Sequence, residues 1–260
     1  MTVVFKAKTQ EGYTVKILSE LLQNIIMIAC LKITKEGIFL RMTDSQMCIL
    51  TDIELLRNNF NIYQMNTEDM FIGLNLGHLF KMLKSVKKKD SLVIYIDDET
   101  PDRLFLVVNP KENNRVSTSS VCIQHTQNIS IPLPTGYQNP IIIPSNEYQR
   151  TLKDMNNISK TLSFNVRQYS LIMTCTADNI FSRDVLFGEL DDDTDIKYAD
   201  EFDIEYFIRT IKIAGLDKLL HVYGGPKHLP LCITTNIGQL GKLSIYIKSQ
   251  KQIKNSTSQL

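Results

Sequence analysis

The sequence predicts an α+β fold in which helices pack on antiparallel sheets, and three observations lead to this prediction. A helix with one apolar face and one Lys- or Arg-bearing face, followed by strand-like segments, occurs four times in the 260 residues. The helices are too few, and the strands too continuous, for a parallel sheet of alternating strands and helices. A proline-containing break near the middle separates two such groups, so we expect two similar domains.

Two helices are expected in the first half, from Gly12 to about Ile28 and over Asn75–Lys84. Each has apolar residues at helical spacing, which places them on one buried side. These residues are Leu18, Leu21, Leu22 and Ile25 in the first helix and Leu76, Leu79, Phe80 and Leu83 in the second. Runs of β-branched and aromatic residues indicate strands. The expected strands are Gly37–Met42, Cys48–Asp52, Met70–Asn75, Ser91–Ile96, Arg103–Asn109 and Val116–Ile123.

The stretch Gln124–Tyr137 interrupts this rhythm. Its two prolines block helix formation and remove backbone donors, and a glycine adds a turn signal. Its isolated apolar residues indicate that the stretch lies against other parts of the protein. The sequence therefore predicts one domain at 1–123, an extended interdomain connector at 124–137 and a second domain at 138–260.

The second half repeats the plan. Helices are expected at Asn146–Asn157 and from Glu205 to about His221. The run Asp191–Asp195 is expected to form a loop because its like charges repel, and the polar tail Gln252–Leu260 is expected to be frayed. The expected strands are Ile141–Ile143, Thr161–Val166, Ser170–Thr176, Asp184–Leu190, Leu231–Asn236 and Leu243–Ile247.

Composition restricts the classes of function. The formal net charge is +1, so any contact with nucleic acid requires cations gathered on one face. The five cysteines form no C-x-x-C pair, which indicates reduced thiols in a cytosolic or nuclear setting. No histidine or cysteine has metal-ligand spacing, no nucleotide-binding glycine motif is present, and Asp44-Ser45 is typical of a turn. The sequence therefore predicts no catalytic residue, metal or cofactor, and no apolar run of membrane-spanning length.

Several segments, in their order along the chain, carry a resemblance to a known family. They are Ile28-Ala29-Cys30, Gly37–Ser45, Gly73–Lys84, Pro144-Ser145 with Tyr148, Arg150 and Leu152, and Leu229–Leu231 with Leu240–Tyr246. Together they resemble the sliding clamps of DNA replication, the proliferating cell nuclear antigen family. The resemblance covers nearly the whole chain.

The resemblance implies a DNA-clamp fold of two similar domains, whose subunits close into a homotrimeric ring around duplex DNA. It implies a processivity factor in DNA replication and repair, without enzymatic activity, in a nucleus or at a cytoplasmic replication site of a virus. A DNA polymerase, a clamp loader, a nuclease or a ligase would bind through short apolar-aromatic peptides. Subunits would join by pairing Val116–Ile123 with Asp184–Leu190 of the next subunit.

Two sets of residues follow from the resemblance. The cations expected to contact phosphates without reading bases are Lys16 (a weaker candidate), Lys81, Lys84, Arg150, Lys153, Arg209 and Lys212. The residues expected to bind partner peptides, called the partner surface below, are Thr43, Met47, Cys48, Leu50, Ile131, Leu133, Pro230 and Tyr246. From the residues alone, the alternatives are a solvated helix face for the first set and separate packing for the second.

Three interpretations stay open on the sequence alone. Ser117–Ser120 are small and polar where the family commonly has an aromatic side chain. This favours, as an alternative, a monomeric or dimeric clamp-like polymerase accessory subunit, which native mass separates from a ring. An α+β enzyme would instead show a deep polar pocket with clustered carboxylates or histidines. The run Lys87–Lys89 is interpreted as a solvated helix end, with a nuclear signal or an extension of the basic surface as alternatives.

Overall fold

A computed structural model describes residues 3–112, 115–127, 129–177, 180–189, 195–226 and 228–257. Contacts between residues divide the chain into two compact units. The first unit consists of Met1–Met42, Thr51–Ile131 and Asn236–Leu243, and the second of Thr43–Leu50, Pro132–Thr235 and Ser244–Leu260. Each unit therefore contains a short segment that comes from the far half of the sequence.

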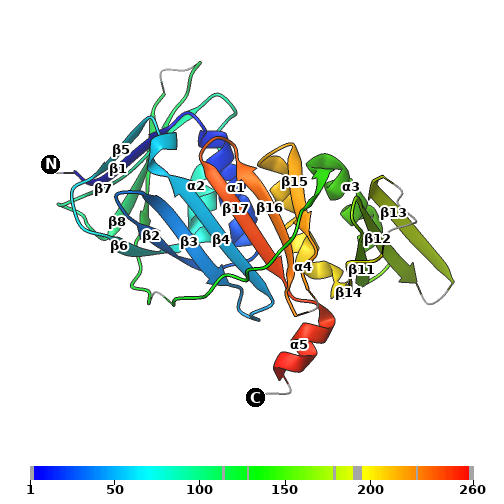
Figure 1. Ribbon diagram of the computed structural model, residues 1–260. Coiled ribbons are helices and arrows are strands. Elements are labelled where there is room, and N and C mark those ends of the chain that lie inside the picture. Colours follow the sequence, from blue (N-terminus) through cyan, green and yellow to red (C-terminus); the bar gives the residue numbers. More distant parts are fainter. Residues whose placement is uncertain are drawn as a thin grey trace. The chain divides into compact units, whose positions relative to one another are not determined.

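The first unit is built from antiparallel strands and two helices (Figure 1). Its elements are β1 Val3–Thr9, α1 Gly12–Gln23, β2 Ile28–Ile33, β3 Gly37–Thr43, β4 Ile49–Leu56, a 3-10 turn at Arg57–Asn59, β5 Ile62–Met65, β6 Met70–Asn75, α2 Leu76–Leu83, β7 Ser91–Asp97, β8 Arg103–Asn109 and β9 Ser117–Cys122. One sheet has the order β5-β1-β7-β8-β9, and β4, β3, β2 and β6 are neighbours in another.

The core of the first unit lies where α1 and α2 meet the strands. Leu18 of α1 and Leu83 of α2 line a small interior space of about 90 Å³ together with apolar side chains of both sheets. Leu21, Leu74 and Leu83 have no exposed side-chain surface. The spacing of Leu18, Leu21 and Leu22 in the sequence thus produces the buried helix face that it predicts.

The second unit is likewise built from antiparallel strands and short helices. They are β10 Ile141–Pro144, α3 Ser145–Asn156, β11 Thr161–Val166, β12 Ser170–Ala177, β13 Phe181–Gly188, β14 Tyr198–Asp203, α4 Ile204–Arg209, a 3-10 helix η2 Ile211–Gly215, β15 Leu219–Tyr223, β16 Leu231–Ile237, β17 Gly241–Ile247 and α5 Gln250–Thr257. One sheet has the order β13-β12-β11-β14, and β10, β15 and β16 are neighbours in another. The α+β class with antiparallel sheets is confirmed.

Aromatic side chains fill the core of the second unit. Phe164 stacks on Phe207 with ring centroids 4.9 Å apart, and Phe202 meets both rings edge-on at 5.5 and 5.4 Å. Tyr148 and Leu152 on the inner face of α3 are fully buried. Such aromatic contacts add roughly 0.5–1.5 kcal/mol each beyond the area that they bury.

Two predictions at helix ends are wrong. The helix expected from Glu205 to about His221 ends at Arg209, because β-branched residues and Gly215 favour the short 3-10 helix that follows. His221 lies instead in β15, opposite Ile142 of β10 and Thr234 of β16. The first helix likewise ends at Gln23 rather than near Ile28, where β2 begins.

The tail expected to fray forms α5 over Gln250–Thr257. Ser249 and Gln252 explain this helix, because they cap its start reciprocally. The Gln252 amide donates to Ser249 Oγ at 3.3 Å, and the Ser249 amide donates to Gln252 Oε1 at 2.9 Å. Most of the predicted acidic loop Asp191–Asp195 lies outside the described residues. No helix in the described ranges is long and apolar enough to cross a membrane.

Candidate functional site

Lys81 and Lys84 lie on the exposed side of α2 in the first unit. Asn75 begins this helix: its Oδ1 accepts a hydrogen bond from the His78 amide at 3.0 Å. Leu76 and Leu83 hold the opposite side of the helix in the core. The two ammonium groups are therefore free to reach a ligand without disturbing the packing.

Lys16 of α1 is placed differently, because other groups of the first unit hold its ammonium. Nζ donates to the carbonyl oxygen of Val86 at 3.0 Å and lies 5.3 Å from the centre of the Tyr13 ring. Its side chain is half-buried. Lys16 therefore contributes more to packing α1 against the turn after α2 than to an open surface.

In the second unit, Arg150 and Lys153 are exposed on α3, opposite the buried Tyr148 and Leu152. The neighbouring Asp154 accepts a hydrogen bond from Arg183 Nη2 of β13 at 3.2 Å. Since both partners are more than a third exposed, water screens this pair and its contribution to stability is small. The α3 surface thus presents a cation pair in the same way as α2.

Arg209 does not lie on an open helix face. Its Nη1 donates to Asp44 Oδ2 at 2.9 Å, and the Asp44 side chain is fully buried. The other carboxylate oxygen accepts the amides of Cys48 and Ile49 at 2.8 and 2.9 Å. Arg209 therefore holds the turn after β3, whereas Lys212 lies half-buried on η2. Sequence reasoning missed this role for Asp44, although an aspartate in a turn is its usual signal.

This turn contains Met47 and Cys48, two predicted members of the partner surface. Met47 has a φ of 55°, and its side chain is 60% exposed. The carbonyl of the next residue, Cys48, accepts the Lys248 amide at 3.0 Å, which joins the turn to the end of β17. Leu50 and Leu133 are half-buried, and Thr43 belongs to the same unit. A flexible, exposed Met beside partly buried apolar groups suits binding of varied apolar peptides.

Tyr137 contacts two predicted members of the partner surface, Pro230 and Tyr246, and sequence reasoning missed it. Its hydroxyl donates to the carbonyl oxygen of Pro230 at 2.8 Å, and its ring lies 6.0 Å from that of Tyr246. Burial raises the pKa of Tyr137, so the phenol stays protonated and keeps donating. A Gly-Tyr pair at the end of a stretch with two prolines is the sequence signal that could have indicated this attachment, and Gly136 has a φ of 101° in the structure.

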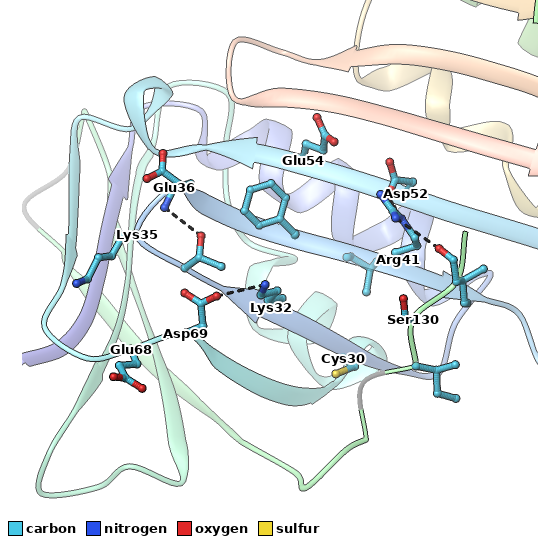
Figure 2. A pocket seen from close by; sticks show the side chains of 15 residues that line it. Cys30, Lys32, Lys35, Glu36, Arg41, Asp52, Glu54, Glu68, Asp69 and Ser130 are labelled. Atoms are coloured by element: carbon cyan, nitrogen blue, oxygen red, sulfur yellow. Dashed lines mark hydrogen bonds and ion pairs between the residues drawn. The ribbon is translucent and has the colours of Figure 1, made fainter. Parts of the chain in front are cut away.

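Ile131, the last member of the partner surface, belongs to the first unit. Arg41 of β3 holds it there: Nη1 donates to the Ile131 carbonyl oxygen at 3.4 Å, while Nε donates to Asp52 Oδ1 at 2.7 Å. Figure 2 shows Arg41 between Asp52 and the connector. Together with the Lys32–Asp69 ion pair at 3.2 Å, these groups line an open groove of about 940 Å³. The groove is lined by side chains of both charges, of which Lys32 pairs with Asp69 and Arg41 with Asp52.

The start of the connector is fixed to β6. Gly73 and Gln124 exchange two backbone hydrogen bonds, of 3.0 and 2.8 Å. A Cβ on Gly73 would collide with the Thr126 side chain and the Gln124 carbonyl, so only glycine allows this approach. Arg41, Tyr137 and this bridge together give the extended stretch three points of attachment.

Two sheet edges are further open surfaces of the molecule. Among the described residues, β9 pairs only with β8 in the first unit, and β13 pairs only with β12 in the second. An edge strand offers unpaired backbone groups to another strand. In the described part of the chain, no three histidine, cysteine, aspartate or glutamate residues gather as metal ligands would.

Comparisons with known proteins agree with this architecture. Residues 4–129 match the family model described as "Proliferating cell nuclear antigen, N-terminal domain". The chain is 22% identical over 255 residues to "Probable DNA polymerase sliding clamp 1" of Paramecium bursaria Chlorella virus 1, covering 94% of this chain and 96% of that protein. It is 26% identical over 230 residues to "DNA polymerase sliding clamp" of Thermococcus onnurineus, covering 85% and 88%. It is 23% identical over 176 residues to "Proliferating cell nuclear antigen" of Chaetomium thermophilum, covering 67% of each.

Proposed function

Because this chain belongs to the proliferating cell nuclear antigen family as a divergent member, we propose that it is a sliding clamp. In this function, subunits close into a homotrimeric ring around duplex DNA and hold a DNA polymerase on its template. A scaffold of this kind needs no catalytic group. The expected place of action is a nucleus or a cytoplasmic viral replication site.

The observation that carries the ring is the pair of open edges. β9 is one of the two edge strands of its sheet in the first unit, and β13 is one of the two edge strands of its sheet in the second, so each copy offers both strands for pairing. Two unlike edges on one subunit form a head-to-tail contact, and such contacts generate closed rings when the rotation between subunits is right. Main-chain hydrogen bonds between β9 and β13 are available even where side chains are small.

The contact with DNA is proposed for cations on the helices. Lys81, Lys84, Arg150 and Lys153 are exposed opposite buried apolar faces. Phosphate contacts from such groups are weak singly, depend on salt and carry no sequence information. We propose lesser contributions from Lys16, Arg209 and Lys212, because the first two have protein partners and the third is half-buried.

Partner proteins are proposed to bind at the partner surface through short apolar-aromatic peptides. Support comes from Met47, exposed on its turn, and from Tyr137, which fixes the connector beside Pro230 and Tyr246. The connector supplies extended backbone for a peptide strand, and the neighbouring apolar groups supply pockets for its side chains. A clamp loader, a nuclease and a ligase are the expected users besides the polymerase.

Retention on DNA of different topology tests the proposed function. The protein should assemble into trimers by sedimentation equilibrium and, once loaded, should stay on nicked circular DNA while sliding off linear DNA of the same sequence. Blocking both ends of the linear DNA should restore retention. A monomer at micromolar concentration in physiological salt, or equal retention on open linear and circular DNA, contradicts a ring.

A further inference from the structure

We propose that the open edge of β5 is a further docking surface, which takes an extended peptide of a partner protein with carboxylates at alternate positions. The peptide joins the sheet β5-β1-β7-β8-β9 as an additional strand, and its carboxylates meet two cations beside the edge. This surface belongs to the first unit alone. It uses no residue of the partner surface and no strand that joins subunits in the proposed ring.

The backbone of β5 has groups that no neighbouring strand pairs. Among the described residues, β5 pairs only with β1. The Asn66 amide donates to the Val4 carbonyl oxygen at 3.1 Å, and the residues that bond to a neighbouring strand alternate along an antiparallel pair. Gln64 therefore faces β1 as Asn66 does, whereas the N–H and C=O groups of Tyr63 and Met65 point to the open side. Such an edge accepts an additional strand.

A groove of about 340 Å³, called the β5 groove here, runs along this edge. Its lining includes Tyr63–Met65 of β5 and the next residue, Asn66. The remaining lining residues are Lys35, in the turn between β2 and β3, and Arg57, in the 3-10 turn that precedes β5. Because consecutive residues of one strand line the groove, a peptide that lies in it follows the strand.

Hydrogen bonds hold the two turns in place beside β5. The Tyr63 hydroxyl donates to the Thr34 carbonyl oxygen at 2.7 Å, and the Arg57 amide donates to the Glu36 carbonyl oxygen at 2.8 Å. The Tyr63 ring also packs edge-on against Phe5, with ring centroids 5.6 Å apart. The β5 groove is therefore preformed, so a peptide that binds there has little of the protein to order.

The charged side chains that line the β5 groove are both cations. Lys35 and Arg57 are exposed, and in the described part of the chain no carboxylate forms an ion pair with either. Asp69, whose charge acts on the Tyr63 hydroxyl, pairs instead with Lys32 at 3.2 Å. Figure 2 shows the Lys35 side chain extending away from Asp69. The β5 groove thus favours an acidic ligand.

The free backbone groups favour a peptide over other anionic ligands. The outward groups of Tyr63 and Met65 include both N–H donors and C=O acceptors, and a second polypeptide backbone supplies partners for both. A DNA phosphate supplies acceptors only. A second copy of this chain, paired through the same edge, would bring Lys35 and Arg57 close to their own counterparts, and like charges oppose that contact.

The spacing of the carboxylates follows from the geometry of a strand. Successive side chains of a strand point to opposite faces of the sheet. Tyr63 reaches Thr34 with its hydroxyl, so the face of β5 that bears Tyr63 is the face on which the turn with Lys35 lies. In an added strand, every second side chain shares that face. Carboxylates at alternate positions therefore meet the cations, and the positions between them face the other side of the sheet.

Binding of a designed peptide to the full-length protein tests this surface. The probe is a capped, fluorescein-labelled hexapeptide of alternating threonine and glutamate, and fluorescence anisotropy measures its affinity. Lys35→Gln should lower the affinity by about two- to fivefold, which is the range for one cross-strand ion pair. Lys35→Glu should lower it further, because it adds a repulsion. Lys242→Gln, which removes an exposed cation on β17, is the matched control and should leave the affinity unchanged.

A second measurement tests strand addition separately from charge. Bound peptide should slow hydrogen exchange at the Tyr63 and Met65 amides, which gain acceptors, and leave the Gln64 amide unchanged. A peptide with proline in place of each threonine keeps the carboxylates but loses backbone donors, so it should not bind. Equal binding of the proline peptide would mean that charge alone attracts the ligand, and the strand proposal would be wrong.

The remaining outcomes separate this surface from the proposed ring. No binding of the threonine–glutamate peptide at millimolar concentration, or equal affinity for the wild-type protein and Lys35→Gln, contradicts the proposal. If Lys35→Gln weakens binding of duplex DNA instead, the β5 groove is part of a DNA surface and the proposal is likewise wrong. Trimer formation of Lys35→Gln by sedimentation equilibrium should match that of the wild-type protein, so failure of the peptide leaves the ring standing. Circular dichroism of each variant excludes loss of the fold as the cause.

Discussion

The two units use the same kind of side chain, a cation on a short helix, for different purposes. On α2 of the first unit, Lys81 and Lys84 are exposed and face outward. On α4 of the second unit, Arg209 turns to the buried Asp44 and holds the turn that presents Met47. The two cations differ because a buried carboxylate, that of Asp44, lies within hydrogen-bond distance of Arg209. Without such an acceptor, a cation on a helix surface stays solvated.

Lys16 lies between these two cases. Its ammonium meets a backbone carbonyl and an aromatic ring, which hold it less firmly than a buried carboxylate would. Position on a helix face therefore does not decide what a cation does. The role of the cation depends on which hydrogen-bond acceptors lie within its reach, and these acceptors come from elements that are remote in the sequence.

Removal of Asp44 should have the largest effect, because Asp44 is the acceptor that distinguishes Arg209 from the exposed lysines of α2. Asp44→Ala leaves Arg209 without its partner and two amides without an acceptor, so we expect a loss of about 3–5 kcal/mol in the free energy of unfolding. Urea denaturation measures the loss. Asp44→Asn should recover part of it by keeping an acceptor for Cys48 and Ile49. Glu54→Ala, which removes an exposed carboxylate, is the control. Equal free energies of unfolding for the two alanine variants would mean that the contact between Arg209 and Asp44 does not stabilise the fold.

A charge on the partner surface should have the next largest effect. Leu133→Asp places a carboxylate where an apolar peptide side chain would dock, so the affinity should fall by several kcal/mol. Isothermal titration with an apolar-aromatic peptide from the cognate polymerase measures the change. Ile129→Asp, a like substitution at a 71% exposed site on the connector, should leave the affinity unchanged. Equal losses in the two variants would mean that the peptide binds elsewhere.

A smaller change tests the anchor of the connector. Tyr137→Phe keeps the ring contacts and removes the hydrogen bond to Pro230, which should cost about 1 kcal/mol of unfolding free energy. Amide hydrogen exchange should increase over residues 132–140 and stay unchanged around Gln124, which β6 holds independently. A uniform increase along the connector would show that its two ends are not separately attached.

The smallest effect is expected from the exposed lysines of α2. Lys81→Ala with Lys84→Ala should preserve the fold and lower DNA affinity equally for all sequences. The slope of affinity against salt should become shallower by roughly 0.9 for each phosphate that the protein no longer neutralises. Arg150→Ala with Lys153→Ala is the matched pair in the second unit, and fluorescence anisotropy across a salt series measures both. Wild-type affinity and slope in both double variants would identify these cations as a solvated face.

Local pattern predicted the fold class and most elements, since helix faces and strand runs depend on nearby residues. It failed where contacts between residues that are remote in the sequence determine the structure. The segment Leu219–Tyr223 resembles a helix end, but β10 and β16 on either side draw it into a strand. The tail from Gln252 is typical of a frayed end, although one serine–glutamine cap starts a helix there.

In the candidate site, too, features set by local sequence could be predicted and features set by contacts between remote residues could not. Exposure of Lys81, Lys84, Arg150 and Lys153 follows from helical spacing alone. The capture of Arg209 by Asp44 could not be predicted, because 165 positions separate the two residues in the sequence. Tyr137 was missed for the same reason, since its acceptor on Pro230 is 93 positions away. The roles of these residues in binding stay predictions.

The exchange of segments between the units has a consequence for synthesis of the protein. The first unit contains residues 236–243, whose Leu240 carbonyl accepts the Leu56 amide at 3.2 Å. A ribosome that has completed Ile131 must still add 105 residues before Asn236 appears. At roughly 5–20 residues per second this takes about 5–20 s. During that interval the first unit lacks residues 236–243, so it cannot complete its fold until most of the second unit has been synthesised.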